Sequence, residues 1–192
     1  QTGDIIAITC KDSSSYTSHV GIAVRKSDGV HFMHATSRRS AGRKVAFTLS
    51  DGFVIARHGD DFRALIEAGE IDILFANEHE LAALTGIEDF HAGLEQLAAK
   101  VPTVVVTRSE NGAHAVSGGE QAHVPAEPIA KVVDTTGAGD AFNGGFAAAL
   151  AEGQDPVDAV RFGSATAGIS VTRAGTAPAM PARAEIEALL RS

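Results

Sequence analysis

The chain has 192 residues, of which 44% are hydrophobic and 21% are charged, and its formal net charge is −8. This length suffices for one ordinary globular domain, and no apolar run approaches the length of a membrane span, so we expect no membrane partner. The acidic balance argues against nucleic acid as a main partner, because phosphate backbones recruit basic faces. The only cysteine, Cys10, permits no intrachain disulfide, and a cytoplasmic location is therefore expected.

The first forty residues are predicted to form short strands separated by Ser- and Gly-rich turns. The pieces Gly3-Asp4-Ile5-Ile6, Ser18-His19-Val20-Gly21-Ile22 and His34-Ala35-Thr36-Ser37 resemble papain-like amidases of the NlpC/P60 kind. That resemblance implies His19 as a base for an upstream cysteine, for which Cys10 is the candidate. Nothing in the sequence marks Cys10 as an activated nucleophile. His19 can therefore be an ordinary histidine, and a thiol hydrolase is the alternative interpretation. Residues 1–41 are interpreted as a β-rich segment that is foreign to the remainder through fusion or misassembly.

A polar run at residues 37–42 is the predicted boundary, which leaves 42–192 as the second region. Strand and helix patterns alternate in this region, as is typical of an α/β fold with a mostly parallel sheet and helices on its faces. The chain begins at Gln1 with no signal-like run, and we interpret it as a fragment. The predicted strands are 44–49, 71–75, 103–107, 113–116 and 122–124, the last two flanking a hairpin turn at Gly118 and Gly119. The predicted helices are 60–68, 78–84, 90–100, 141–151, 156–171 and 185–190, with Gly86 as the C-cap of the second.

The central stretch of the chain is residues 132–146, where two valines lead into a Thr/Gly turn and an Ala-rich helix. The glycines therefore lie at a helix N-terminus, whose unpaired N–H groups and positive dipole favour an anion such as phosphate. Asp140 in the same place suggests a base beside a phosphate, and hence phosphoryl transfer. The alternative is that Asp140 simply caps the helix. No Gly-Lys-Ser/Thr ending of a Walker loop follows, and the third glycine of a dinucleotide fingerprint is missing.

Polar residues follow three apolar segments that are predicted to be strands. These residues are Asn77, Thr107 and Asp134. In open α/β sheets ligands collect beyond the carboxyl ends of the strands. The sequence therefore predicts that one edge of the sheet gathers all three.

Three motifs in register resemble the PfkB family, the ribokinase-like sugar and nucleoside kinases. They are Asn77-Glu78-His79-Glu80 followed by Leu84-Thr85-Gly86, the segment 104–113, and Asp134-Thr135-Thr136-Gly137-Ala138-Gly139-Asp140-Ala141-Phe142. The resemblance implies a three-layer α-β-α ribokinase-like sheet in which the N-terminal part of the fold and the lid are missing. The tract 47–77 is most similar to bacterial adenosine-kinase-type members, and the tail 171–175 to ribokinase.

The resemblance also implies a function and its residues. The activity is ATP-dependent phosphoryl transfer to a hydroxyl of a small sugar or nucleoside, of adenosine or ribose type. Asp140 is the implied base, and the backbone of Gly137, Ala138, Gly139 and Asp140 the anion hole. Mg²⁺ would be held through water near Glu80, and K⁺ beside Asp134 and the carbonyl of Thr136. The family more often has Gly where Ser109 stands. The implied nucleotide contacts are Asn77, Thr107, Ser109, Glu110, Gly112, Ser164 and Gly168.

Several alternatives stay open at this point. Glu80 can be a solvated helix carboxylate, and Asp134 can serve only to tie down its turn. Small residues along the predicted helix 156–171, such as Gly163, can permit close packing in place of a flat ligand. The chain can be a nucleotide-binding remnant without turnover, because half of the positioning apparatus is absent. Exposed core surface would favour self-association, and a homodimer is left open.

Overall fold

The computed structural model describes residues 23–26, 29–32 and 45–191, with side chains from residue 45 onward. These residues form two compact units, each described by itself. We call residues 45–106 and 116–120 the N-terminal unit, and residues 107–115 and 121–191 the C-terminal unit. Strands β1 (Ala23–Lys26) and β2 (Gly29–Phe32) pair antiparallel, with Ala23 opposite Phe32. Cys10 and His19, the predicted hydrolase pair, lie outside the described residues.

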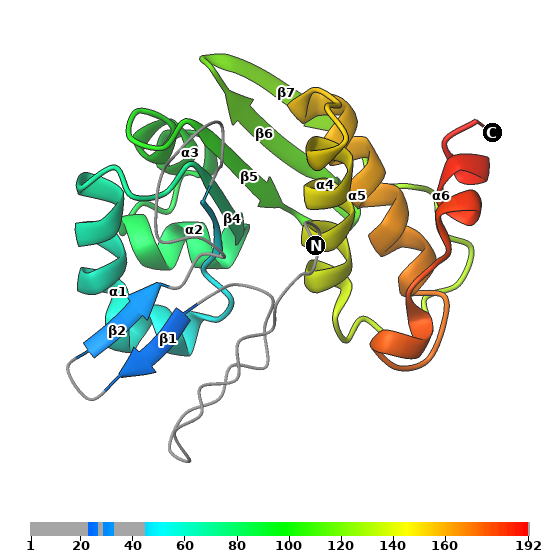
Figure 1. Cartoon of the computed structure of the whole chain (residues 1–192), viewed down its shortest axis with the longest axis horizontal. Coiled ribbons are helices and arrows are strands. Elements are labelled where there is room, and N and C mark those ends of the chain that lie inside the picture. Colours follow the sequence, from blue (N-terminus) through cyan, green and yellow to red (C-terminus); the bar gives the residue numbers. More distant parts are fainter. Residues whose placement is uncertain (1–22, 27–28, 33–44, 192) are drawn as a thin grey trace. The chain divides into compact units, whose positions relative to one another are not determined.

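The main sheet has five strands in the order β3-β4-β5-β6-β7 (Figure 1). β3 pairs parallel to β4, with Ala46 opposite Ile73. The N–H of Thr103 donates to the carbonyl of Asp72 at 3.0 Å, so β5 begins at the same edge as β4. β6 and β7 follow through connections too short for anything but antiparallel pairing. The strands are β3 (Ala46–Thr48), β4 (Ile73–Asn77), β5 (Thr103–Thr107), β6 (Ala113–Ser117) and β7 (Glu120–Val124).

The predicted β6–β7 hairpin has the turn that its sequence demands. Gly118 and Gly119 both have positive φ, at 60° and 86°. Two left-handed residues form the turn type whose twist matches that of the paired strands, and glycine takes this conformation without a β-carbon clash. The fold is thus an α/β fold, as the sequence predicted, and its sheet is mixed because β6 and β7 add antiparallel strands.

The helices of the N-terminal unit begin at polar side chains that bind their free backbone N–H groups. Asp51 accepts from Phe53 N at 2.6 Å, and Asp89 accepts from Ala92 N at 2.8 Å. The predicted helix 60–68 covers only the second half of the first helix, because Asp51 starts it a full two turns earlier. The helices are α1 (Gly52–Glu67), α2 (Glu78–Thr85) and α3 (Phe90–Ala98).

The core of the N-terminal unit lies between β3–β5 and these helices. The rings of Phe47 and Phe62 meet edge to face with centroids 5.2 Å apart, and Phe62 is 1% exposed. Burying side chains of this size contributes about 1.5–3 kcal/mol each. The buried core residues include Leu49, Ile55, Ile66, Leu74, Leu81, Leu84, Leu94, Leu97, Val104 and Val106.

In the C-terminal unit, α4 and α5 pack closely because small residues face one another. A β-carbon at Gly145 would lie 2.4 Å from Thr166 Oγ1, and one at Gly163 would lie 2.8 Å from the Phe142 carbonyl. Close packing is therefore the reason for Gly163, in place of a flat ligand. The helices of this unit are α4 (Ala138–Ala151), α5 (Pro156–Ser170) and α6 (Arg183–Leu189), with 3₁₀ turns η1 (Ser109–Asn111) and η2 (Ala177–Ala179).

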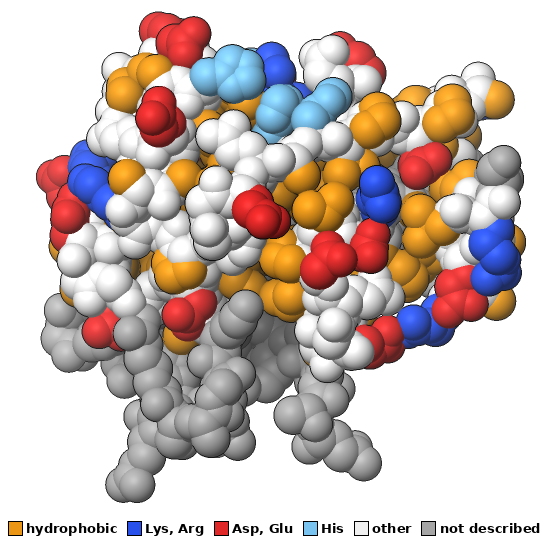
Figure 2. All heavy atoms as spheres, turned by 90° about the horizontal axis from the view of Figure 1, so that it is seen from above, with side chains coloured by type: hydrophobic (Ala, Val, Ile, Leu, Met, Phe, Trp, Pro, Cys, Tyr) orange, Lys and Arg blue, Asp and Glu red, His pale blue; other side chains and the backbone are white. Residues whose placement is uncertain are grey.

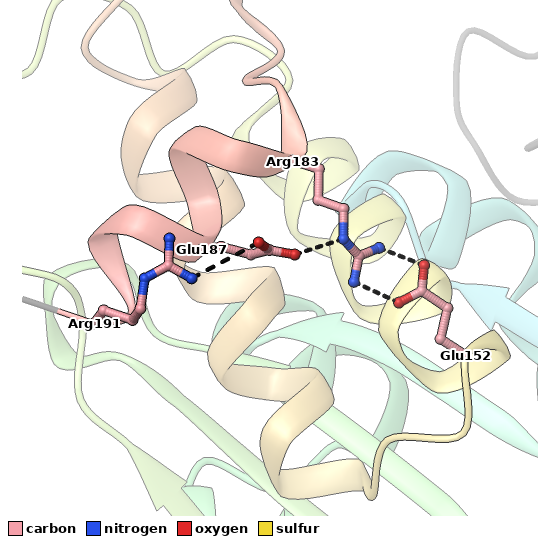
Figure 3. A network of polar contacts seen from close by, with 4 residues as sticks. All are labelled: Glu152, Arg183, Glu187 and Arg191. Atoms are coloured by element: carbon pink, nitrogen blue, oxygen red, sulfur yellow. Dashed lines mark hydrogen bonds and ion pairs between the residues drawn. The ribbon is translucent and has the colours of Figure 1, made fainter.

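One arginine joins α6 to the end of α4 and to α5 (Figure 3). The guanidinium of Arg183 donates to both carboxylate oxygens of Glu152, with Nη2 2.7 Å from Oε2, and through Nε to Glu187 at 2.7 Å. It also lies over the ring of Phe162, 5.5 Å from the centroid. The hydrogen bond from Arg183 holds the pKa of Glu152 below its ordinary value. Bidentate geometry gives such a pair more weight than a single exposed ion pair.

No helix in the described ranges is both long and apolar enough to cross a bilayer.

The contact between α4 and α5 can be tested at Gly145. Gly145→Ala should lower the free energy of unfolding by about 1–3 kcal/mol, because the added carbon overlaps Thr166. Urea unfolding followed by circular dichroism measures this loss. Gly52→Ala is the matched control: a β-carbon there meets nothing within 4 Å, and alanine should leave stability equal or higher. Equal stability of the Gly145 variant and the wild type would contradict the close packing.

Candidate functional site

The Asn77–Glu80 segment joins β4 to α2 in the N-terminal unit. Asn77 Oδ1 accepts from the N–H of Glu80 at 2.8 Å, and Glu80 Oε2 accepts from the N–H of Asn77 at 2.9 Å. Asn77 Nδ2 donates to Glu80 Oε1 at 2.8 Å. The two side chains therefore form a reciprocal cap that satisfies free N–H groups at the helix start. At the other end of α2, Gly86 is the C-cap, as predicted, and takes a left-handed conformation with φ of 73°.

Glu80 is buried, with only 7% of its surface exposed. The alternative of a solvated helix carboxylate is therefore wrong. A buried carboxylate must keep hydrogen-bond partners, and Asn77 supplies them. Its role toward Mg²⁺ stays a prediction. Among the described residues, no group of three or more His, Cys, Asp or Glu side chains is placed to hold a metal ion.

The N-terminus of α4 is organised by Gly137 in the C-terminal unit. Gly137 is the residue before the first helical turn and has φ of 79°, which disfavours any residue with a β-carbon. Such a carbon would also lie 3.1 Å from Thr176 Cγ2. The N–H of Ala138 donates to the carbonyl of Thr135 at 3.1 Å. The predicted helix 141–151 thus starts three residues earlier than expected.

No side chain caps α4. Helices α1, α2, α3 and α5 each begin instead at an Asp or Asn whose side-chain oxygen accepts from the backbone. Asp140 is the third residue of α4 and lies half-buried in its first turn, so the alternative that it is the cap residue is wrong. A carboxylate in the first turn is also favoured by the helix dipole.

Asp134 uses its two carboxylate oxygens on two different loops. Oδ1 accepts from the N–H of Thr136 and Oδ2 from the N–H of Gly175, both at 2.9 Å. Hydrogen bonds from Thr136 and then from Gly175 lower the pKa of Asp134, because they favour its charged form. The structure thus confirms that Asp134 ties down its turn. A cation beside Asp134 and Thr136 stays a prediction.

The predicted strand before Asp134 is absent. Residues 125–135 form no strand, and Val132 and Val133 are 55% and 50% exposed. The N–H groups of Val133 and Asp134 donate to the carbonyl of Val171, at 2.7 and 3.2 Å, so this segment is held by the end of α5. The expectation that three site residues follow strands is correct for Asn77 and Thr107 and wrong for Asp134.

The end of β5 and the turn that follows it contain four of the predicted nucleotide contacts. Thr107 ends the strand, and Arg108 N donates to the Gly112 carbonyl at 2.7 Å. Ser109 has φ of 50°, a left-handed conformation that glycine takes without cost, which explains why glycine suits this position. Glu110 is exposed. A β-carbon at Gly112 would lie 2.1 Å from the carbonyl oxygen of Val124, so only glycine fits there.

The last two predicted nucleotide contacts lie on α5. Ser164 is buried at 9% exposure, and Gly168 is half-buried. A β-carbon at Gly168 would lie 3.3 Å from both Glu127 Cβ and Ile129 Cδ1. The face of α5 at Gly168 therefore packs against the 127–129 segment, and a contact of either residue with adenine stays a prediction.

Within the C-terminal unit, the structure brings Asp134, Thr136 and Gly137 together with the loop 175–176. Sequence analysis did not single out Thr176, because nothing local marks a threonine that packs on a glycine 39 positions earlier. It also did not single out the end of β7, which packs on Gly112. Contacts of this kind leave no signal in the sequence beyond the glycine itself.

The tie made by Asp134 can be tested by acid titration. Asp134→Asn should destabilise the fold at neutral pH, because an amide nitrogen would face the N–H of Gly175 in place of an oxygen. The folded-state pKa of Asp134 is lowered, so its contribution is present above the unfolded value of 3.8 and is lost as pH falls through the lower folded value. Melting temperatures of both proteins from pH 7 to pH 2.5 measure this. The difference in melting temperature between the two proteins should disappear in acid. A difference that does not depend on pH would contradict the hydrogen bonding proposed for the Asp134 carboxylate.

The comparisons with known proteins agree on one family. A model of the pfkB family carbohydrate kinases matches residues 15–183. The chain is 39% identical to the ribokinase of Bacillus subtilis over 117 residues, which cover 61% of this chain and 39% of the ribokinase. A probable sugar kinase from Rhizobium etli is 38% identical, with a TM-score of 0.72 over 78% of this chain and 44% of that one. Adenosine kinase from Sinorhizobium meliloti is 37% identical, with a TM-score of 0.71 over 78% of this chain and 45% of the adenosine kinase.

Two further similar structures contain ligands. Arabidopsis thaliana ribokinase, complexed with ribose and ATP, is 30% identical with a TM-score of 0.66 over 79% of this chain and 48% of that one. An Escherichia coli protein described as ribokinase II, in complex with ATP and Mg²⁺, is 28% identical. Its TM-score is 0.70 over 78% of this chain and 49% of the Escherichia coli protein. The chain spans less than half the length of each of these relatives. Since the family model matches most of its residues, the chain belongs to the PfkB family of carbohydrate kinases.

Proposed function

We propose that this chain supplies the nucleotide-binding and catalytic part of a kinase that transfers the γ-phosphoryl group of ATP to a hydroxyl of a sugar or nucleoside. The observation that carries the proposal is the start of α4. Gly137 precedes this helix, no side chain caps it, and Asp140 lies in its first turn. Helix N-termini of this kind bind phosphate through backbone N–H groups.

The anion hole in this proposal is made of backbone. The N–H groups at Gly137, Gly139 and Asp140 would face the transferring phosphoryl group as negative charge develops on it. The N–H of Ala138 would join them only by leaving the carbonyl of Thr135, to which it donates at 3.1 Å. Backbone donors fixed in a helix need no reorganisation at the moment of reaction. The contact of Thr176 with Gly137 and the tie of Asp134 to Gly175 hold the turn before these donors.

Asp140 would act as the base. It would accept the proton of the substrate hydroxyl while that oxygen attacks the γ-phosphorus in line and the bond to the β-phosphate oxygen breaks, leaving ADP. A carboxylate at this place would repel a bound phosphate unless a metal ion or the reacting hydroxyl lay between them. General-base catalysis of this kind contributes about 10²–10⁴-fold to rate.

ATP and Mg²⁺ are the proposed cofactors, since relatives with the same fold hold them. The donor set near α2 is one buried carboxylate, Glu80, and the amide of Asn77. Mg²⁺ usually keeps several water ligands and needs few protein ligands, so this set fits an ion held through water. When bound, the ion would neutralise charge on the phosphates. K⁺ would lie beside Asp134 and the Thr136 carbonyl, whose oxygens are of the type that this cation prefers.

The substrate is proposed as a small sugar or nucleoside of ribose or adenosine type. A ribokinase and an adenosine kinase are 39% and 37% identical to the chain, and the adenosine-type resemblance of the 47–77 tract favours the nucleoside slightly. The second candidate function is nucleotide binding without turnover. This candidate concerns the residues of this chain alone, which align with 39% of the ribokinase, because phosphoryl transfer depends on positioning by groups throughout an enzyme.

Calorimetric titration of Mg-ATP tests the proposal. Gly139→Val should weaken binding about tenfold or more, because the branched side chain fills the space before the backbone donors. A β-carbon at Gly139 meets nothing within 4 Å, so the fold should tolerate this change. Glu80→Ala should weaken Mg-ATP binding more than binding of ATP without Mg²⁺.

Turnover with adenosine or ribose is then measured for wild type and Asp140→Asn. The variant should bind Mg-ATP but lose about 10²-fold or more of its rate. Failure of the folded wild type to bind Mg-ATP would overturn the proposal. Binding without turnover on either substrate would establish the second candidate instead.

A further inference from the structure

Outside the residues already discussed, the end of β7 packs on the turn after β5, and both segments belong to the C-terminal unit. The ring of His123 reaches this turn, where its Nε2–H donates to the carbonyl of Asn111 at 2.9 Å. Asn111 is the last residue of η1, the short helix that begins at Ser109.

The ring of His123 is itself held in place. It stacks on the ring of His114 from the neighbouring strand β6, with centroids 4.5 Å apart and planes 29° from parallel. Figure 2 shows histidine side chains lying next to one another at the surface. Stacked rings across a strand pair limit the rotation of each, so the donor of His123 is aimed at the turn.

The turn needs such support because part of it is strained. Ser109 has φ of 50°, and a residue with a β-carbon pays to hold this conformation. The turn is also restricted on its other side, since the backbone of residues 124–126 packs directly against Gly112. Strained backbone persists only where its surroundings determine it, and His123 supplies one of the contacts that do so.

We infer that His123 is a positioning residue for the nucleotide: through Asn111 it holds the 109–112 turn in the shape that meets ATP. This inference rests on the proposed function, in which Ser109, Glu110 and Gly112 contact the nucleotide. His123 touches neither ATP nor the reacting atoms in this proposal. It acts by keeping the turn ready, so that binding does not have to order the turn first.

His123→Ala tests the inference with two readouts. Calorimetry should show Mg-ATP binding weakened about threefold to tenfold, the range expected when one hydrogen bond that orders the turn is lost. Trypsin cleaves after arginine, and the Arg108–Ser109 bond lies at the start of the turn. Cleavage there, identified by mass spectrometry, should be faster in the variant, with an unchanged melting temperature.

Two matched variants complete the experiment. His123→Gln keeps an N–H donor of similar reach and should restore both binding and resistance to trypsin. His91→Ala removes an exposed histidine of α3 and should change neither.

Each outcome decides the matter. Weaker binding and faster cleavage in His123→Ala, both restored in His123→Gln, would support the inference. Unchanged binding in His123→Ala would overturn it, whether or not cleavage accelerates. A wild-type chain that binds no Mg-ATP would overturn the proposed function itself, and with it the nucleotide role of His123, whereas the trypsin result would still show whether His123 holds the turn.

Discussion

The site in the C-terminal unit depends on the carboxylate of Asp134. Its oxygens bind two N–H groups that are 39 positions apart in the sequence, on Thr136 and Gly175. This fixes the turn before α4 against the loop after α5. Gly137 can then adopt its left-handed conformation beneath Thr176, and α4 can begin without a side-chain cap. A helix start that is held from outside needs no side-chain cap, so a first-turn N–H group such as that of Gly139 can face a ligand, as an anion site requires.

The close packing of α4 and α5 supports the same arrangement. Gly145 and Gly163 allow the helices to approach until backbone meets side chain, so neither helix can slide without a clash. Arg183 then holds α6 against the end of α4 and the ring of Phe162. Dense packing resists displacement, and a misplacement of about 1 Å in a phosphoryl-transfer site is costly. Rigidity in these helices is therefore part of how the first turn of α4 would work.

The sequence predicted those features whose causes lie close together in the chain. Helix α2 ends at Gly86, and Gly118 with Gly119 forms a hairpin turn, so local rules suffice for both. The segment at Val132 and Val133 was predicted as a strand because β-branched residues favour strands. Its N–H groups pair instead with the carbonyl of Val171, a partner that no local rule identifies.

The same distinction applies to the candidate site. The glycine-rich turn and Asp140 could be identified from the sequence, because a helix N-terminus and its first-turn carboxylate are consecutive residues. Thr176 and His123 could not, since each acts on a segment that only the fold brings to it. The burial of Glu80 also follows from tertiary packing, which composition does not record.

The chemistry proposed for the described site concerns binding of the phosphate and does not select the molecule that accepts the phosphoryl group. Its proposed donors are backbone N–H groups, which would recognise an oxyanion whatever molecule receives the phosphoryl group. The chain is 39% identical to a ribokinase and 37% identical to an adenosine kinase, and donors of this kind would suit the phosphoryl transfer of either enzyme. In the proposed reaction one base, Asp140, would serve any hydroxyl that is presented in line. We expect the choice between sugar and nucleoside to come from contacts outside the first turn of α4, since a helix N-terminus has no means of distinguishing ribose from adenosine.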